Sequence, residues 1–199
     1  IILAAGIGKR MKSDIPKVLH RIAGAPMLSY PLETVKSVGI RKIVVIIGHK
    51  GDMVKDAVEK TGILFANQEP QLGTGHAVMC AEGLLKDCRG EILILSGDVP
   101  LITKETIKDL LRNHKKSNAV LSFISTTTPI PTGYGRVCRD KDNSVIKIVE
   151  DKDADNEERK NREINTGIYC VSKEFLFSNL KKIRNKNAQG EYYLPDLIE

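Results

Sequence analysis

The sequence contains no tryptophan, and aromatic residues make up only 5% of its 199 positions. Proteins that bind single-stranded nucleic acids stack bases on aromatic side chains, so this scarcity argues against that class. No apolar run approaches the roughly 18 residues that a membrane-spanning helix needs. The chain opens on an apolar segment at Ile1, with neither an initiator methionine nor the basic stretch that begins a signal peptide. We therefore expect no membrane segment and no signal peptide, and we expect the chain to be truncated at both ends.

Cysteine is also scarce, and its spacing carries no metal-binding signature. The cysteines form no C-x-x-C pair, and the histidines show no H-E-x-x-H spacing. The common zinc patterns are therefore missing. Unpaired thiols in apolar surroundings indicate reduced cysteines in a cytoplasmic protein. The cysteines are Cys80, Cys88, Cys138 and Cys170.

Basic residues outnumber acidic ones by 31 to 25, which gives a net charge of +6. A basic balance suits nucleic acids, anionic membrane surfaces or small polyanions. Much of the surplus lies in residues 181–186, a run that is typical of a solvated helix end. Because few aromatic residues are present, small anionic substrates are favoured over nucleic acids.

Short apolar runs alternate with amphipathic stretches over the first 127 residues. Runs that predict strands span residues 1–4, 42–47, 63–66, 92–95 and 119–125. Stretches that predict helices span residues 27–38, 53–60, 76–85 and 106–114, and Thr103 is placed to cap the last of them. Strands that are apolar almost throughout, each followed by a helix, favour a parallel sheet covered on both faces. The predicted fold class is α/β, with a doubly wound, mostly parallel sheet.

Proline and glycine interrupt the chain between residues 129 and 135, and the pattern then changes. Short strands at 136–139 and 145–150 are joined by a hairpin-type connection. A charged helical stretch at 154–160, a strand at 166–171, a helix at about 173–182 and the start of a helix at 194–199 follow. We therefore divide the chain into a first part at 1–127 and a smaller β-rich part at 128–199.

The segment after the first predicted strand combines glycine with positive charge. It reads Leu3-Ala4-Ala5-Gly6-Ile7-Gly8-Lys9-Arg10-Met11, and Pro16-Lys17 follows. Small residues let backbone N–H groups approach a polyanion, and Arg10 and Lys17 add charge suited to phosphate oxygens. The segment lacks the ending of a Walker A loop, and Met11 stands where a dinucleotide fingerprint needs a third glycine. On these residues alone, it is either a phosphate cradle or a turn with two solvated cations.

Asp98 follows the apolar run at residues 92–95. Ligands of an open parallel sheet bind beyond the carboxyl ends of its strands, so Asp98 is expected to face the cleft. A carboxylate there can hold Mg²⁺ together with substrate phosphates. It can equally cap the turn before Pro100, and spacing alone does not decide between these roles.

An ordered set of motifs narrows the interpretation. L-A-A-G-x-G-x-R-M with P-K-V-L-H is followed by Q-L-G-T-G-H-A, G-D-V-P-L, P-T-G-Y-G-R, E-I-N-T-G and N-A-Q-G-E-Y-Y. This set resembles the sugar nucleotidyltransferases, which have a Rossmann-like fold. Within that family it is similar to the uridylyltransferase half of the bifunctional enzymes that join UDP-N-acetylglucosamine pyrophosphorylase to an N-acetyltransferase. The resemblance runs essentially from end to end of the chain.

The resemblance implies a role for individual residues. Arg10 and Lys17 would be catalytic, and Asp98 would hold Mg²⁺ with a second ligand, an asparagine, beyond the end of this sequence. Residues 1–127 would bind the nucleotide and residues 128–199 the sugar. Lys152 is a weaker candidate and is expected to be exposed. The implied substrate-binding residues are Leu3, Ala4, Ala5, Gly6, Lys17, Gln68, Gly73, Thr74, Gly97, Asp98, Gly135, Glu150 and Asn165.

Two groups among these residues have a chemical rationale. Gln68, Gly73 and Thr74 would read the uracil base through amide and backbone groups, although the Gly-Thr-Gly run is also a helix N-cap turn. Gly135, Glu150 and Asn165 would hold sugar hydroxyls and an N-acetyl group. Without the resemblance, Glu150 would be assigned to the surface.

The implied reaction transfers UMP from UTP to N-acetylglucosamine-1-phosphate, giving UDP-N-acetylglucosamine for cell-wall precursor synthesis and releasing pyrophosphate. An alternative enzyme would use another sugar phosphate, such as glucose-1-phosphate, or another nucleotide. A second alternative is a nucleotide-sugar-binding module without turnover, and a nucleic-acid binder is a distant third. The resemblance also implies a homotrimer formed through a C-terminal domain absent from this sequence.

Overall fold

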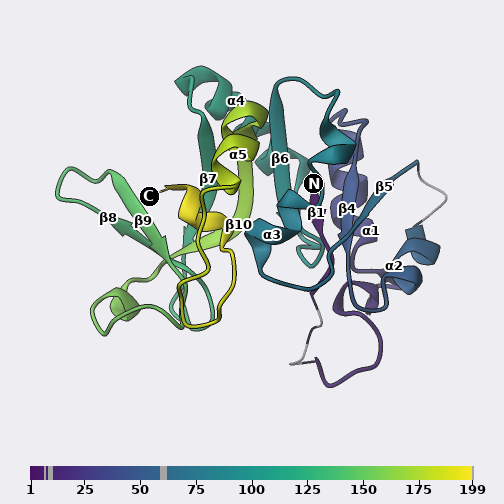
Figure 1. Cartoon of the computed structure of the whole chain (residues 1–199), viewed down its shortest axis with the longest axis horizontal. Coiled ribbons are helices and arrows are strands. Elements are labelled where there is room, and N and C mark those ends of the chain that lie inside the picture. The colour runs from purple at the N-terminus through teal and green to yellow at the C-terminus, as the bar shows by residue number, and fades with distance from the viewer. Residues whose placement is uncertain (7, 9–10, 59–61, 199) are drawn as a thin grey trace.

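The computed structural model describes residues 1–6, 8, 11–58 and 62–198, and over these residues one mixed sheet organises the chain (Figure 1). Its parallel part consists of β5 (Leu64–Asn67), β4 (Val44–Ile47), β1 (Ile2–Leu3) and β6 (Glu91–Ser96), in that order. These strands are short, apolar runs, as expected for strands buried on both faces. The described strands therefore confirm the predicted doubly wound α/β fold.

The sheet continues with strands from the second half of the chain. β10 (Glu163–Ser172) pairs antiparallel with β6, and it also pairs antiparallel with β7 (Leu121–Thr127) and β8 (Arg136–Arg139). β8 forms a hairpin with β9 (Val145–Val149). β10 therefore joins the parallel strands to the β-rich part. The sequence pattern predicted the strand but not this position, because strand order depends on contacts between distant residues.

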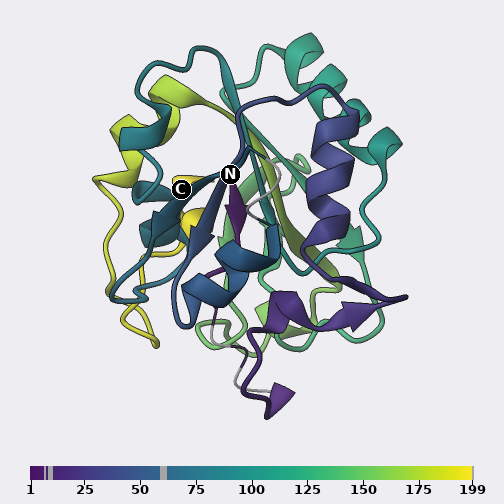
Figure 2. The same ribbon diagram turned by 90° about the vertical axis from the view of Figure 1, so that its right-hand side faces the viewer.

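Helices cover both faces of the sheet. α1 (Ser29–Ser37) and α4 (Lys104–Ser117) lie on one side and α5 (Lys173–Leu180) lies on the other (Figure 2). Buried side chains alternate along β6, where Leu93 and Leu95 pack with the first group and Ile92 and Ile94 with the second. This alternation follows from the two-residue period of a strand. α2 (Gly51–Val58) joins the first layer, and α3 (Thr74–Met79) joins the second.

The predicted cap of α4 is present. The side chain of Thr103 accepts a hydrogen bond from the Thr106 backbone N–H at 3.1 Å, which satisfies a donor that the helix itself leaves unpaired. Ile107 and Leu110 are buried on the inner face of the helix. The apolar spacing of this segment therefore predicted both the helix and its buried face.

Several predicted elements differ in type or length. The helical stretch at 154–160 is reduced to a 3-10 turn, Glu158–Lys160, because Asp155 and Asn161 bond to local backbone groups instead. The helix predicted at 76–85 divides into α3 and a 3-10 turn at Gly83–Leu85. The chain also contains 3-10 turns at Lys17–Leu19 and Leu194–Ile198. A small ribbon of β2 (Arg21–Ile22) and β3 (Ala25–Pro26) was not predicted.

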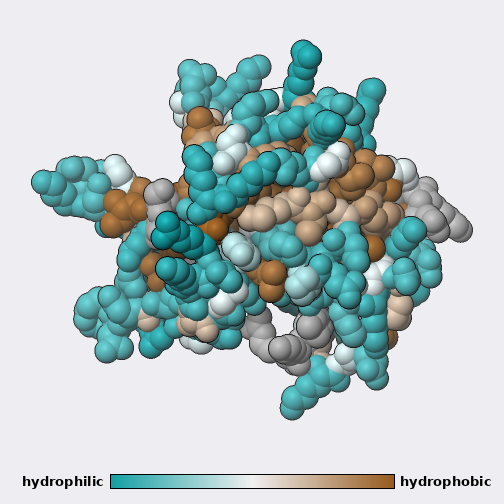
Figure 3. Space-filling model, viewed as in Figure 1, coloured by the Kyte–Doolittle hydropathy of each residue, from teal (hydrophilic) through white to brown (hydrophobic). Residues whose placement is uncertain are grey.

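Hydrophilic residues cover most of the face viewed in Figure 3, and apolar residues gather in a band across its middle. Among the helices of the described residues, none is long and apolar enough to cross a membrane.

Candidate active site

A cleft of about 600 Å³ opens where the loops after β1, β5 and β6 meet the segment at residues 189–191. This is the carboxyl end of the parallel strands, where open α/β sheets bind their ligands. The described residues that line it are Leu3, Ala4, Ala5, Gly6, Gly8, Lys17, Val18, Gln68, Gln71, Gly73, Thr74, Ala77, Ser96, Asp98, Lys152, Gln189 and Glu191. The structure therefore gathers into one cleft almost all the residues predicted from the first half of the chain.

One described residue of that half, Gly97, is placed differently. Gly97 lies behind the lining, where its backbone N–H donates to the Leu3 carbonyl at 2.8 Å. An added Cβ there would lie 3.0 Å from the Leu28 side chain and 3.2 Å from the Leu3 carbonyl oxygen, so glycine lets the chain after β6 lie close to β1 and to the start of α1. Arg10 lies outside the described residues.

The loop that follows β1 and contains Gly6 and Gly8 is called the glycine loop below. It contacts Lys17 through Gly8. Gly8 has a φ of +65°, and an added Cβ would lie only 2.9 Å from the Cβ of Lys17. A side chain at this position would therefore be strained by its backbone and would also meet Lys17. The loop can approach Lys17 this closely only because the residue is glycine.

Lys17 and Asp98 form an ion pair inside the cleft. They come from loops that are 81 residues apart in the sequence. Their side chains are 35% and 29% exposed, so both can also reach a ligand. The cleft therefore offers a cation suited to phosphate and a carboxylate suited to a divalent metal, side by side.

The turn predicted to read a base spans residues 68–74 and is called the base turn below. It is held by hydrogen bonds. The buried Gln68 amide donates to the Gly73 carbonyl at 2.8 Å. Gly73 has a φ of +99°, and an added Cβ would lie 2.7 Å from the Tyr192 carbonyl oxygen. The Thr74 hydroxyl accepts from the Leu194 backbone N–H at 3.0 Å. The turn is therefore held from both sides, and the segment after residue 190 packs directly against it.

Gln71 also lines the cleft, but its role was not predicted. Its side-chain amide donates to the Ala5 carbonyl at 2.7 Å and so ties the base turn to the glycine loop. Gln189 and Lys152 meet at another wall, where the Lys152 ammonium donates to the Gln189 amide oxygen at 2.6 Å. Lys152 is exposed, as predicted, and it still lines the cleft. Gln71 and Gln189 stand within the motifs quoted above. Membership of these motifs was the only indication in the sequence that they lie at the site.

The three predicted residues of the second half lie together but are not among those that line the cleft. The Asn165 backbone N–H donates to the Gly135 carbonyl at 2.9 Å. A Cβ on Gly135 would lie 3.4 Å from a carboxylate oxygen of Glu150. Glu150 lines a neighbouring hollow of about 420 Å³ with Asp153 and other residues.

Glu150 is in an environment that disfavours its charge. Burial raises the pKa of this carboxyl group, and the nearby carboxylates, Asp153 first and then Asp196, raise the pKa further. A sugar hydroxyl or amide N–H that donated to Glu150 would stabilise the charged form. The predicted assignment of Glu150 to substrate binding is therefore chemically reasonable, whereas a plain surface position does not describe it.

A second cluster with metal-binding side chains lies at the opposite end of β6. Ligand atoms of Glu91, His114 and Cys170 lie within 4.8 Å of one another. Both ring nitrogens of His114 already have partners, Ser122 at 2.8 Å and Glu91 at 3.0 Å. Burial raises the pKa of Cys170 to about 12, which keeps the thiol protonated. Hydrogen bonds therefore already occupy both nitrogens of His114, and the cluster is separate from the cleft.

Comparison with known proteins gives concordant results. The family model described as "Nucleotidyl transferase" matches residues 1–199. "Bifunctional protein GlmU" of Thermoanaerobacter pseudethanolicus is 49% identical over 199 residues, which cover 100% of this chain and 43% of that protein. The protein of the same name from Clostridium botulinum is 47% identical over the same span, which is 44% of its length. The chain thus spans less than half the length of these relatives.

Solved structures show the same fold. UDP-glucose pyrophosphorylase complexed with UDP-glucose has a TM-score of 0.80 at 16% identity, and the alignment covers 98% of this chain and 83% of that chain. HddC from Yersinia pseudotuberculosis complexed with GMP-PN has a TM-score of 0.70 at 24% identity, with 98% and 81% covered.

Proposed function

Because the chain belongs to the nucleotidyl transferase family, we propose that it transfers UMP from UTP to N-acetylglucosamine-1-phosphate. The products are UDP-N-acetylglucosamine, a precursor for cell-wall synthesis, and pyrophosphate. The observation that carries the proposal is the Lys17–Asp98 ion pair, which lies in one cleft with the glycine loop and the base turn. Each of these features suits one part of a nucleoside triphosphate.

In the proposed reaction, a phosphate oxygen of the sugar-1-phosphate attacks the α-phosphorus of UTP. A new bond forms between that oxygen and the α-phosphorus, and the bond from the α-phosphorus to the oxygen that bridges it to the β-phosphorus breaks, so that this oxygen leaves with pyrophosphate. The nucleophile is already an anion at neutral pH, so no general base is needed. The main obstacle is to bring two polyanions together, and catalysis rests on positioning and charge neutralisation.

Different residues of the cleft would contact different parts of the nucleotide. The backbone at residues 3–6 and Gly8 can approach the phosphates closely, and Lys17 would neutralise charge on them. The predicted role of Arg10 is the same and rests on the sequence. Gln68, Gly73 and Thr74 would hold the uracil, because their turn lines the same cleft.

Mg²⁺ is the cofactor that we propose, and Asp98 is the residue that would hold it. The fit rests on donor chemistry: a partly exposed carboxylate at the end of β6 supplies the oxygen ligands that Mg²⁺ prefers. When bound, the ion would offset negative charge on the phosphates. Lys17 would then turn from Asp98 towards the substrate.

Gly135, Glu150 and Asn165 would hold the sugar. They lie next to one another, directly before β8, directly after β9 and near the start of β10, respectively. None of them is among the residues that line the cleft, so sugar binding requires the hollow beside Glu150 to join it. Lys152 lies at the border and would face the sugar phosphate.

An alternative substrate pair is glucose-1-phosphate with UTP, or a sugar phosphate with another nucleotide. Against this alternative, Gln68 and the segment of Asn165 favour UTP and an N-acetylated sugar, because both supply amide groups at buried positions. A binding module without turnover is the second alternative. Its weakness is that Lys17 and Asp98 are both retained and are both partly exposed.

A pyrophosphate-release assay tests the proposal. The chain and a version extended at the C-terminus would be compared with UTP and each of N-acetylglucosamine-1-phosphate, glucose-1-phosphate and galactose-1-phosphate, at several Mg²⁺ concentrations. We expect the highest kcat/KM for N-acetylglucosamine-1-phosphate. Release that is faster with glucose-1-phosphate would favour the alternative enzyme. Binding of UDP-N-acetylglucosamine without any release in the extended version would favour the binding module.

A cytoplasmic location and a homotrimer formed through a further C-terminal domain are part of the same proposal. The expectation that neither nucleic acid nor a membrane is a partner also stays a prediction. Salt-dependent binding to duplex DNA would contradict it.

A further inference from the structure

Strand β10 carries an irregularity beside the cleft. Asn165 pairs with Ser125 on β7, and Tyr169 pairs with Phe123, so four steps along β10 correspond to two along β7. Two extra residues are therefore accommodated between Asn165 and Tyr169. Gly167, within this bulge, has a φ of +74°, and a Cβ on it would approach Ser96, a residue of the cleft wall, to 4.0 Å. The bulge therefore lies directly behind the cleft. Bulges of this kind often re-aim side chains.

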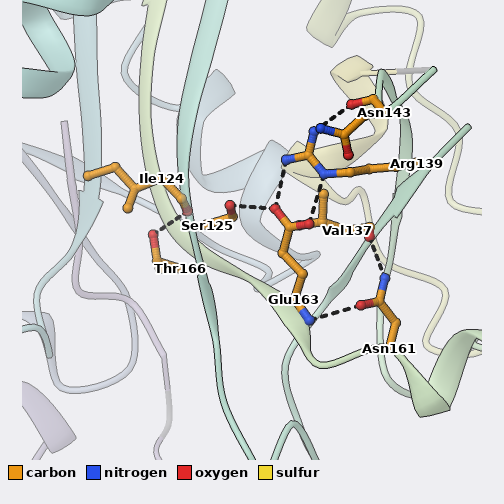
Figure 4. A network of polar contacts seen from close by, with 8 residues as sticks. All are labelled: Ile124, Ser125, Val137, Arg139, Asn143, Asn161, Glu163 and Thr166. Atoms are coloured by element: carbon orange, nitrogen blue, oxygen red, sulfur yellow. Dashed lines mark hydrogen bonds and ion pairs between the residues drawn. The ribbon is translucent and has the colours of Figure 1, made fainter.

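The bulge is fixed at its first residues by a network of polar contacts (Figure 4). Glu163 receives hydrogen bonds from Arg139 at 2.8 Å and from Ser125 at 2.6 Å. The Thr166 hydroxyl donates to the Ile124 carbonyl at 2.7 Å. These bonds join β10 to β7 and β8 on either side of Asn165. The backbone that carries Asn165 is consequently held in place by its neighbours.

The side chain of Asn165 is held at both of its polar ends. Its Oδ1 accepts from the Gly167 backbone N–H at 3.0 Å, and its Nδ2 donates to the Tyr169 hydroxyl at 2.6 Å. Because the Gly167 N–H is a donor, a flipped amide would place two donors against each other. The bond to Tyr169 uses one of the two hydrogens on Nδ2, so one hydrogen remains to be donated.

Tyr169 is suited to this task. Its side chain is only 3% exposed, and its ring lies 6.3 Å from that of Phe123 in the core. Burial raises the pKa of Tyr169, with smaller contributions from Glu150 and Asp196, so the hydroxyl stays protonated at neutral pH. The hydroxyl is thus a fixed, neutral acceptor behind Asn165. A Phe in its place would fill the core equally well but could not hold the amide.

We infer that Tyr169 is a positioning residue, which orients the amide of Asn165 so that its remaining N–H is offered to an acceptor oxygen of the sugar substituent, such as an acetamido carbonyl. The inference rests on the proposed function, because it assigns the sugar to the region of Gly135, Glu150 and Asn165. It adds to that function a residue that does not touch the substrate and that determines preference for an N-acetylated sugar. A residue that only fills the core would affect all sugars alike.

The test compares Tyr169→Phe with the unmodified protein. Losing one hydrogen bond between neutral groups lowers affinity by about 3- to 10-fold. We expect KM for N-acetylglucosamine-1-phosphate to rise by about that factor, while KM for UTP and for glucose-1-phosphate changes by less than about 2-fold. The matched control is Tyr30→Phe, which likewise removes a single tyrosine hydroxyl, one that donates to the backbone carbonyl of Ile22 rather than holding a side-chain amide. Tyr30 is not among the described residues that line the cleft, and its variant should leave all three KM values unchanged.

A double-mutant cycle shows whether Tyr169 acts through its partner. In an Asn165→Ala background, Tyr169→Phe should cause no further change, because the amide that it positions is gone. Equal losses for both sugars, or an undiminished effect in the Asn165→Ala background, would overturn the inference.

A binding measurement separates this inference from the proposed function. Calorimetry would give the dissociation constants of UDP-N-acetylglucosamine and UDP-glucose for the same variants. If no sugar phosphate is turned over, the proposed function fails, and the inference is then judged on these constants alone. A preference for the N-acetylated ligand that is lost in Tyr169→Phe supports it. The absence of any preference in the unmodified protein refutes it.

Discussion

The close packing of Gly73 allows a quantitative prediction. Gly73 has a φ of +99°, and an added Cβ would lie 2.7 Å from the Tyr192 carbonyl oxygen and 2.8 Å from the Glu191 Cβ. A non-glycine residue at positive φ costs about 1–2 kcal/mol. Overpacking against a backbone atom that cannot turn aside adds about 1–3 kcal/mol. We therefore expect Gly73→Ala to lower the free energy of unfolding by about 2–5 kcal/mol.

Gly24→Ala is the matched control for this prediction. Gly24 has a φ of +88°, and its added Cβ would meet nothing within 4 Å, so only the backbone penalty applies. For a domain of this size, 1 kcal/mol shifts the melting temperature by about 2–4 °C. We expect a loss of about 4–20 °C for Gly73→Ala and about 2–8 °C for Gly24→Ala, measured by calorimetry.

The same substitution should also affect substrate binding. The Tyr192 carbonyl accepts a hydrogen bond from the Gly75 backbone N–H at 2.7 Å, and displacing it would shift the base turn. KM for UTP should therefore rise for Gly73→Ala and stay unchanged for Gly24→Ala. If Gly73→Ala were no less stable than Gly24→Ala, the reasoning from close contact between the turn and residues 191–192 would be refuted.

Three further predictions concern charged groups. Lys17→Ala and Arg10→Ala should each lower kcat by about 10²–10³-fold while the melting temperature changes little; near-normal turnover in both would remove their catalytic assignment. Asp98→Asn should abolish most Mg²⁺-dependent activity, and an unchanged Mg²⁺ titration would rule out the ligand role. Glu150→Gln should raise the melting temperature at pH 7. Because the pKa of Glu150 is raised in the folded state, its protonated form stabilises the fold relative to its charged form. This contribution is fully present below pH 4.5 and is lost as pH rises through the folded-state pKa, where the carboxylate becomes charged. The difference between Glu150→Gln and the unmodified protein should therefore vanish below pH 4.5, and a difference independent of pH would contradict this cause.

Local patterns predicted most of the elements but not their arrangement. The apolar run at residues 92–95 became the centre of β6, and the spacing of Ile107 and Leu110 gave the buried face of α4. Both depend on neighbours in the sequence. The pairing of β10 with β6 joins Tyr169 to Ile94, and no residue near either of them encodes it. Strand order is determined by contacts between residues that are far apart in the sequence. The local pattern of apolar and polar residues in a single sequence therefore does not predict it.

The candidate site was predictable to the extent that it consists of motifs. Lys17 and Asp98 were named from separate segments, and the structure brings them into contact. Gln71 was missed as a functional residue because its bond to the Ala5 carbonyl spans 66 positions and leaves no local trace. The orientation of Asn165 was hidden for the same reason, since it depends on a bulge that only the register between β10 and β7 reveals.

The position of β10 links the two parts of the chain physically. Its second half pairs with β6, which ends beside Asp98, and its first half pairs with β8, which begins beside Gly135. Asn165 lies between these two pairings, at the start of the bulge. A strand shared by both parts fixes the distance between the end for which we propose phosphate binding and the end for which we propose sugar binding. The Lys152–Gln189 bond adds a second connection at this border, because it joins the segment after β9 to the segment at residues 189–191, and both line the cleft.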